Sequence, residues 1–537
     1  MNIFKRIPAI FLFFGFLLFS SGAAQSSVSE DVAYFSSLSS RVPGYPGNKA
    51  AADYIEARFR SLGLQQIKRE GYLVTVPVEE SSVLECQGKK VKISALWPNH
   101  VRTSTVPPEG ITGTLVYGGD GSLVNYSGND LKGAIVLLDF NCGFRWLDAG
   151  LLGAQAVIFI APDDTTFFEA RRKFLSMPLD LPRFYITRQD ADILLSGLSR
   201  ARNTKMVKPV PAKLSCRQNW QAAPAENILG YIRGTDPKLK DDIICLSAYY
   251  DSISVVPSLA PGADQASSIA GFLDLAAYFS QNPPKRTILF LATGSHFQTL
   301  RGMGDFVTRH YRKERTFLTK DLEPINIRLL VGLELSSHSD LLATYSNGLS
   351  TNLYAQRYFA PFAKKFLEYV PAAFSGKLLN GVSPEKGVAF SAFLPESIST
   401  DGSLSLLAGL PSLSFVTVYD NRRYFDTPLD VAARTNSAKL AGQVELLRQL
   451  LNRAFNDSEF FPEGVLEFKD TMRTLKGRIV SFDPKAGFVP NQPIANAIVA
   501  PRIPPTVSYQ NRKSAYGVRG EYLELTDAKG RLHPNPK

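Results

Sequence analysis

The sequence predicts an α/β protein with a mixed, mostly parallel sheet sandwiched by helices, together with a β-rich insert and a C-terminal β-sandwich. Four near-continuous apolar runs predict the central strands: 243–248, 287–292, 329–335 and 412–418. Helical patterns such as that of residues 266–279 lie between the runs. Continuous rather than alternating apolar strands, spaced by helices, indicate a largely parallel sheet covered on both faces.

The composition sets the class of protein and limits its metal chemistry. The 537 residues are 45% hydrophobic and 20% charged, which is ordinary for a globular protein and argues against disorder, a coiled coil or a collagen-like fibre. Four Cys without a CxxC pair exclude zinc fingers and iron–sulfur ferredoxins, and five His leave little room for a His-rich centre. Any metal must therefore depend on carboxylates. The net charge of +11 is spread along the chain, which indicates solubility or attraction to an anionic envelope and no nucleic-acid partner.

The first 24 residues have the pattern of a secretory signal peptide. Lys5 and Arg6 precede an apolar run over 7–19, and small residues then lead to a cleavage position after Ala24. The alternative is an uncleaved membrane anchor, which the short apolar run disfavours. No later segment resembles a membrane span, so we expect a mature chain without one, secreted or periplasmic.

The state of the four cysteines depends on the compartment of the mature chain. In an oxidising space they can pair in three ways; they are Cys86, Cys142, Cys216 and Cys245. Because Cys245 lies within an apolar run, we expect it to be a buried free thiol.

The remaining elements follow in order along the chain. Residues 25–106 form the first part of the central domain, with an amphipathic helix over 48–62 and strands over 72–78 and 91–96. Residues 107–205 form an insert, for which the pattern predicts a helix over 146–152 and the strands 113–117, 134–139, 156–160 and 183–186.

The central domain resumes over 206–465, starting with a strand over 227–232 and ending with a long helix that Asn436 caps. Residues 470–537 change character, because short strands there alternate with Pro, Gly and Asn turns; the strands are 478–482, 497–501 and 522–526. This pattern predicts a β-sandwich module that is truncated or reduced, since it is shorter than the roughly 100 residues of a usual sandwich.

Polar residues directly follow the predicted parallel strands. In such a sheet a ligand site lies beyond the carboxyl ends of the strands, where the loops that follow neighbouring strands lie side by side. The residues at these ends are Tyr249 and Asp251, Asp264, Ser295 and His296, Glu334, and Asp426.

The order and spacing of these residues resemble the zinc-dependent aminopeptidase family that includes glutamate carboxypeptidase and the transferrin-receptor ectodomain. Members show HYD, GADDNASG, TGEE, NLD and YHTxxD at these strand ends. Segments 227–232, 285–287 and 408–411 match as well, as does the N-terminal segment 41–44 with its helix. The insert is similar to the protease-associated insert of that family, and the tail resembles the prealbumin-like sandwich of some secreted carboxypeptidases.

The resemblance implies two zinc ions bridged by an aspartate, with a Glu as general base on a bridging water. This chain keeps the bridging Asp264 and the supporting aspartate, Asp251. It departs from the pattern at five positions: Tyr249 replaces the His of HYD, Ser295 the base Glu, His296 the ligand Glu, Glu334 the Asp of NLD, and Asp426 the His of YHT.

The two implied metal positions differ in what they retain. One would be formed by Asp264, His296 and Asp426, in which a carboxylate and an imidazole have exchanged places. The other would need Tyr249 beside Glu334, and a neutral phenol is a poor metal ligand, so we expect it to be empty. The sequence thus predicts one divalent metal, zinc, in a pocket whose carboxylates repel without a cation. The alternative is that His296 pairs with a carboxylate, or that loop divergence moves Asp426 away.

Catalysis is predicted to be impaired, because Ser295 cannot act as the general base. A Ser295–His296 nucleophile pair is disfavoured, since adjacent residues rarely face each other and no GxSxG motif is present. His338 is interpreted as a solvated loop residue or as a replacement ligand.

Three functions follow from the sequence. The first is an exported metallopeptidase-family protein, a pseudoenzyme that binds a peptide or protein ligand or acts as a scaffold. The second is an active single-metal exopeptidase, aminopeptidase-like in its proteolysis. The third is binding of a cell-surface polymer or partner through the insert and the tail.

Overall fold

The structure is a computed structural model. It describes residues 27–99, 102–174, 179–196, 210–311, 323–345, 353–382, 394, 398–407 and 410–461, and within the tail 477–483, 485, 487, 492–499, 524–525 and 527–529. The predicted signal peptide lies outside the described residues. Of the helices in the described part, none is long and apolar enough to cross a membrane.

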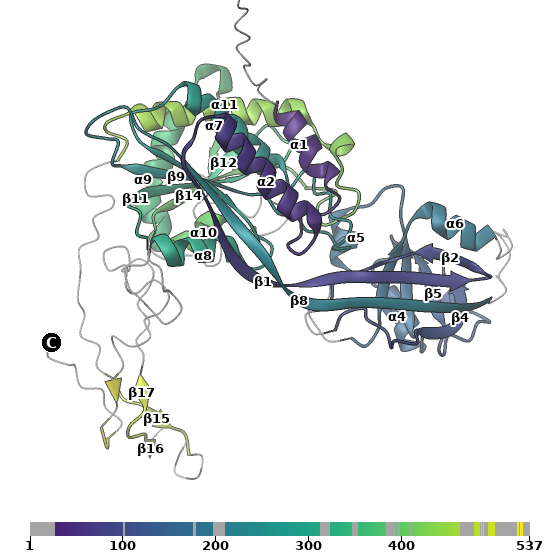
Figure 1. Cartoon of the computed structure of the whole chain (residues 1–537). Coiled ribbons are helices and arrows are strands. Elements are labelled where there is room, and N and C mark those ends of the chain that lie inside the picture. Colours follow the sequence, from purple (N-terminus) through teal and green to yellow (C-terminus); the bar gives the residue numbers. More distant parts are fainter. Residues whose placement is uncertain are drawn as a thin grey trace, which may run out of the picture.

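Four parallel strands form the centre of the main lobe (Figure 1). Strand β9 (Ile243–Tyr249) pairs in parallel with β10 (Ile288–Thr293) on one side and with β11 (Ile327–Glu334) on the other. Strand β14 (Ser412–Thr417) continues the parallel order beside β11. These are the four predicted apolar runs, and their carboxyl ends meet at one edge.

Antiparallel strands flank this centre and make the sheet mixed, as predicted. On one side β8 (Val210–Ile232) runs antiparallel to β10. On the other side β12 (Leu342–Tyr345) runs antiparallel to β14 and parallel to β13 (Leu378–Asn380).

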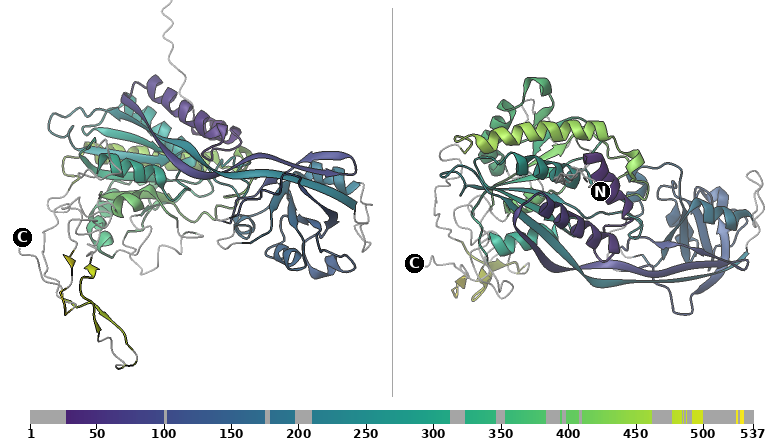
Figure 2. Two further views of the ribbon diagram at one scale, coloured as in Figure 1. Left: turned by 60° about the horizontal axis from the view of Figure 1, so that its bottom comes forward. Right: turned by 45° about the horizontal axis from the view of Figure 1, so that its top comes forward.

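Helices cover both faces of the main sheet, which confirms the predicted layers (Figure 2). Helices that contact one another on one face enclose the largest apolar core; they are α1 (Val28–Ser37), α2 (Pro46–Ser61), α7 (Ser267–Gln281) and α11 (Ser437–Asn456). The opposite face carries α8 (Arg301–His310) and α10 (Asp401–Leu407). The side chain of Asn436 accepts a hydrogen bond from the Lys439 N–H at 3.1 Å, which confirms the predicted cap.

A long two-stranded ribbon connects the main lobe to the insert (Figure 1). Strand β1 (Gln65–Cys86) pairs antiparallel with β8 over almost its whole length. The sequence predicted only short strands at 72–78 and 227–232, because just those parts are strongly apolar; elsewhere exposed and buried residues alternate along the ribbon. The ribbon ends in β2 (Lys89–Lys92), and β3 (Ser94–Ala95) follows.

The strands of the insert continue the sheet of the main lobe, because β4 (Ile111–Tyr117) pairs antiparallel with the outer part of β8, and this part of the sheet has an apolar core on each face. Its strands β4 to β7 are parallel and lie within the predicted ranges to within two residues: Ile111–Tyr117, Ile135–Asp139, Ala156–Ile160 and Arg183–Ile186. Its helices are α3 (Leu123–Tyr126), α4 (Trp146–Leu151), α5 (Phe167–Arg171) and α6 (Arg188–Ser196). The domain boundaries remain predictions.

The remaining described elements include α9 (Leu353–Glu368), which packs on the largest apolar core through Phe362 and Phe366. In the main lobe the others are the 3₁₀ turns Ala372–Phe374 and Ala432–Arg434. In the described parts of the tail they are the two-residue strands β15 (Val480–Ser481), β16 (Gln492–Pro493), β17 (Ile498–Val499) and β18 (Glu524–Leu525), so the β-sandwich stays a prediction. All four cysteines are buried free thiols, as expected for Cys245.

Candidate functional site

The predicted site residues come from the strand ends and the loops that follow them. Tyr249 is the last residue of β9, and Glu334 is the last residue of β11. Asp264 precedes α7, and Ser295 and His296 follow β10. All five side chains are buried.

Tyr249 links two of the predicted residues. Its hydroxyl donates a hydrogen bond to Glu334 Oε1 at 3.2 Å. Its ring stacks on His296, with the centroids 4.1 Å apart and the planes at 27°. Burial, together with the charge of Glu334, raises the pKa of Tyr249 well above its usual value, so the phenol is a neutral hydrogen-bond donor.

His296 has a partner that the sequence did not indicate. Its Nδ1 lies 3.4 Å from Asp401 Oδ1, at the start of α10. Burial on its own would lower the pKa of His296, but the hydrogen bond to Asp401 and the charges of Glu334, Asp401 and Asp251 outweigh it and raise the pKa to about 9. With this pKa the ring is an imidazolium at neutral pH when no metal ion is bound, and it pairs with the Asp401 carboxylate.

Asp426 faces the insert. Its Oδ2 lies 3.4 Å from Nε of Arg171, at the end of α5. Its backbone is in the left-handed region, with φ of 63°, and its carbonyl accepts the Val255 N–H at 2.8 Å.

Arg422 brings a buried cation to the predicted pocket. It is only 4% exposed, and its Nη1 lies 3.9 Å from Glu334 Oε1. Within the described residues, no hydrogen-bond partner is found for any of its three guanidinium nitrogens. Nothing in the local sequence pattern shows that the chain folds Arg422 back toward β11.

Glu334 is therefore held by three neighbours of different kinds. Burial raises its pKa, while His296, Arg422 and the Tyr249 hydroxyl oppose that rise. A phenol and a guanidinium thus approach the carboxylate at the position where the family pattern places a metal ion.

Backbone contacts hold Asp264, the retained bridging residue. Its N–H donates to Asp430 Oδ1 at 2.8 Å, and its Oδ1 accepts the Ser337 N–H at 2.7 Å. The preceding loop is fixed by buried Arg41, whose guanidinium donates to the Pro261 carbonyl at 2.6 Å and the Gly262 carbonyl at 2.9 Å.

Asp251, the residue expected to support the site, also forms hydrogen bonds with backbone N–H groups. It accepts the N–H of His296 at 3.0 Å and of Phe297 at 3.4 Å, and so fixes the turn after β10. Ser295 lies in this turn with φ of 55°, a left-handed conformation that is strained for a residue with a side chain.

Asp264 has two further polar neighbours. His338 Nδ1 lies 3.9 Å from Asp264 Oδ1 and 3.9 Å from Asp420 Oδ2. The three side chains offer one donor atom each within 4.8 Å of one another. The sequence raised His338 as a replacement ligand but missed Asp420, whose position two residues after the last apolar run was its only signal.

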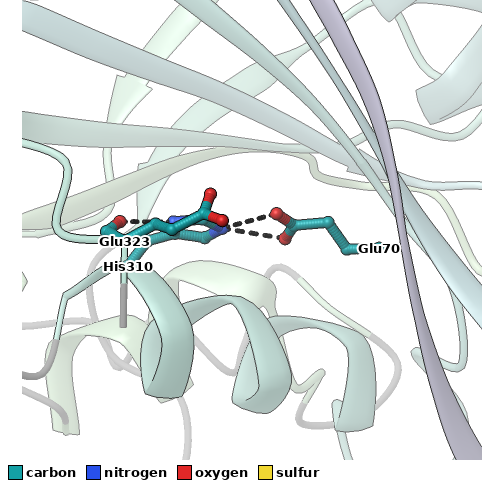
Figure 3. Close-up of side chains that lie close together, drawn as sticks. All are labelled: Glu70, His310 and Glu323. Carbon is teal, nitrogen blue, oxygen red and sulfur yellow. Dashed lines mark hydrogen bonds and ion pairs between the residues drawn. The ribbon is translucent and has the colours of Figure 1, made fainter. Parts of the chain in front are cut away.

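A second such group lies away from the strand ends (Figure 3). His310 Nε2 contacts Glu70 Oε1 at 2.9 Å and Oε2 at 2.8 Å, and its Nδ1 contacts the Glu323 carbonyl at 2.7 Å. Lys68 Nζ lies 3.2 Å from Glu70 and 2.5 Å from Glu323. Both ring nitrogens and both carboxylates are engaged, so we interpret this group as an ion-pair network that joins β1 to α8.

The described residues therefore do not bring the predicted ligands together as a set. The two groups with three donors within 4.8 Å are the ones above, and neither contains His296, Glu334 or Asp426. The metal role of those residues remains a prediction.

The mostly parallel sheet with polar residues at its carboxyl edge defines a zinc aminopeptidase-like α/β fold. A zinc aminopeptidase from Bacillus subtilis aligns with a TM-score of 0.50 at 18% sequence identity, over 80% of this chain and 95% of that chain. An aminopeptidase from Aneurinibacillus sp. strain AM-1 aligns with a TM-score of 0.44 at 20% identity, over 82% and 96%. A peptidase M28 precursor from Shewanella amazonensis SB2B aligns with a TM-score of 0.48 at 18% identity, over 81% and 94%. At such identities the likeness to the Bacillus enzyme shows the fold.

The sequence itself matches a family. Residues 227–451, less than half of the chain, match the model of peptidase family M28, so this segment resembles an M28 peptidase domain. No curated protein matches the sequence.

Proposed function

We propose that this chain is an exported M28-domain protein with impaired hydrolysis, which acts as a binding or scaffold module for a peptide or protein ligand. The observation that carries the proposal is the setting of Glu334, whose carboxylate accepts a hydrogen bond from the hydroxyl of Tyr249, the residue at the family's histidine position, and lies 3.9 Å from buried Arg422. Ser295 at the general-base position removes the group that would activate water.

The metals that the family implies fit this pocket only in part. The donors of a two-ion centre do not converge, because His296 faces Asp401 and Asp426 faces Arg171. A single divalent ion beside Asp264 is compatible with the donors present. A two-metal clamp on a tetrahedral intermediate is therefore not part of the proposed function.

The test is hydrolysis by the mature protein. We expect no turnover of aminoacyl or dipeptide substrates above background, with zinc or with chelator, and a folded, monodisperse protein throughout. Chelator-sensitive turnover that Asp264→Ala abolishes would overturn this proposal in favour of an active single-metal exopeptidase.

A second candidate function rests on the far end of the insert. A cavity of about 610 Å³ there is lined by Lys89, Lys90, Lys132 and Lys213, with Glu85 as the acidic residue. Such a basic surface favours an anionic cell-surface polymer as ligand. Lys132→Glu combined with Lys213→Glu should weaken retention on an anionic polysaccharide column at low salt, while equal retention of wild type and variant would exclude this cavity as the binding surface.

A further inference from the structure

We propose that Asp264, His338 and Asp420 form a site for one divalent cation, with a ligand set that differs from the one the family pattern implies. The inference deepens the proposed function, on which it rests for the location of the pocket, but it does not require hydrolysis. The ion would be structural, holding the carboxyl edge of the sheet closed.

The orientation of His338 is the first argument. Its Nε2 lies 2.8 Å from the Arg434 carbonyl, which can only accept, so this nitrogen carries the hydrogen. In the neutral ring the lone pair is then on Nδ1, which faces both carboxylates. A histidine that binds a metal through one ring nitrogen usually donates a hydrogen bond from the other, often to a backbone carbonyl.

The distances are the second argument. Nδ1 lies 3.9 Å from each carboxylate oxygen, which is too long for a hydrogen bond. Two donors bound to one zinc ion at about 2.1 Å lie roughly 3.4 Å apart in a tetrahedron and at most about 4.2 Å apart. The two Nδ1–oxygen distances fall between these values, and all three donor atoms lie within 4.8 Å of one another, so an ion can bind between them when the side chains move inward.

The third argument is that hydrogen bonds fix both carboxylates and that, among the described residues, neither forms an ion pair with a Lys or Arg side chain, although the charge of Arg422 acts on Asp264. Asp420 accepts the Ser336 hydroxyl at 2.7 Å, the His338 N–H at 2.9 Å and the Arg422 N–H at 2.9 Å. Both carboxylates are buried. Asp264 Oδ1 accepts one hydrogen bond and keeps a lone pair, whereas Asp420 Oδ2 already accepts two, so a bound ion would take the place of one of them. Two buried neighbouring carboxylates favour a cation between them.

The side chain of His338 is 35% exposed, so an ion can reach the site from solvent. Two carboxylates and one imidazole suit zinc, and also cobalt or manganese. The competing explanation is that a protonated His338 is itself the cation, in which case the site binds no metal.

The experiment is titration of the chelator-treated mature protein with Zn²⁺ by calorimetry, and with Co²⁺ by visible absorption. We expect one equivalent to bind and zinc to raise the melting temperature. His338→Gln should reduce the affinity for zinc at least about 10- to 100-fold, because removing only a residue that hydrogen-bonds to a metal ligand already costs that much. His338→Cys should restore part of the affinity. Circular dichroism of each variant checks that it is folded.

Three outcomes would overturn the inference. A wild-type protein that binds no metal would leave protonated His338 as the counter-ion, while the proposed function would stand. Loss of binding in His296→Gln with retention in His338→Gln would place the ion in the ligand set expected from the family. Loss of binding in His310→Gln alone would place it at Glu70 and Glu323.

Discussion

Arg422 differs from its neighbour Arg423 in its surroundings. Arg422 is buried beside Glu334, whereas the Arg423 side chain is 46% exposed and pairs with Asp164 of the insert. In the sequence the two arginines are indistinguishable. Only the fold, which turns the loop after β14 back over the end of β11, separates a buried counter-ion from a surface charge.

Replacing Arg422 with Met should destabilise the protein by about 1–3 kcal/mol, because it removes one of the two cations near buried Glu334 and leaves only His296. Arg423→Met is the matched control and should cost less than about 1 kcal/mol, since exposed ion pairs contribute little. Urea unfolding of both variants measures the difference in the free energy of unfolding. An equal decrease in both variants would show that Arg422 does not stabilise the pocket.

His296 should make stability depend on pH. Its folded pKa of about 9 lies above the ordinary 6.5, so protonation favours the folded state. The contribution is complete below about pH 6.5 and is lost as the pH rises to about 9, on the order of 3 kcal/mol in total. The difference in unfolding free energy between wild type and His296→Gln, measured across this range, should fall with pH. A constant difference would contradict the pairing with Asp401.

At the scale of elements, the sequence predicted most of the main lobe. The four parallel strands, α7 and the Asn436 cap lie where the apolar patterns placed them, because each depends on residues that are adjacent in the chain. The length of the β1–β8 ribbon was underestimated, because cross-strand pairing and not a continuous run of apolar residues stabilises its outer half. The Glu70–His310 contact could not be found for the same reason, as it joins residues 240 positions apart.

This contact should stabilise the junction of β1 and α8. Burial alone would raise the pKa of Glu70, but His310 and Lys68 outweigh it and lower the pKa. Glu70→Gln should cost about 1–3 kcal/mol, because it weakens a buried, charge-assisted bond. Glu323→Gln is the control, since that side chain is 60% exposed, and should cost under about 1 kcal/mol. Comparable melting temperatures for the two variants would argue against the network.

At the scale of the whole molecule, the insert contacts loops of the main lobe that carry candidate site residues, and its helix α5 lies toward the main lobe (Figure 1). Arg171 of the insert reaches Asp426, and Arg434 of the main lobe pairs with Asp164 at 3.0 Å. Val255 and Val256, in the loop after β9, lie in an apolar core of the insert. The residue types at the strand ends could be predicted from the sequence, but their partners Asp401, Arg171 and Asp420 could not, because each comes from a distant segment.

The central claim is that this M28 domain has lost its hydrolytic centre. The most direct measurement is kcat/KM on a panel of aminoacyl and dipeptide substrates, for zinc-loaded wild type and for Asp264→Ala. The account predicts that both proteins are equal to the uncatalysed background. Turnover by wild type that disappears in Asp264→Ala and with chelator would contradict it.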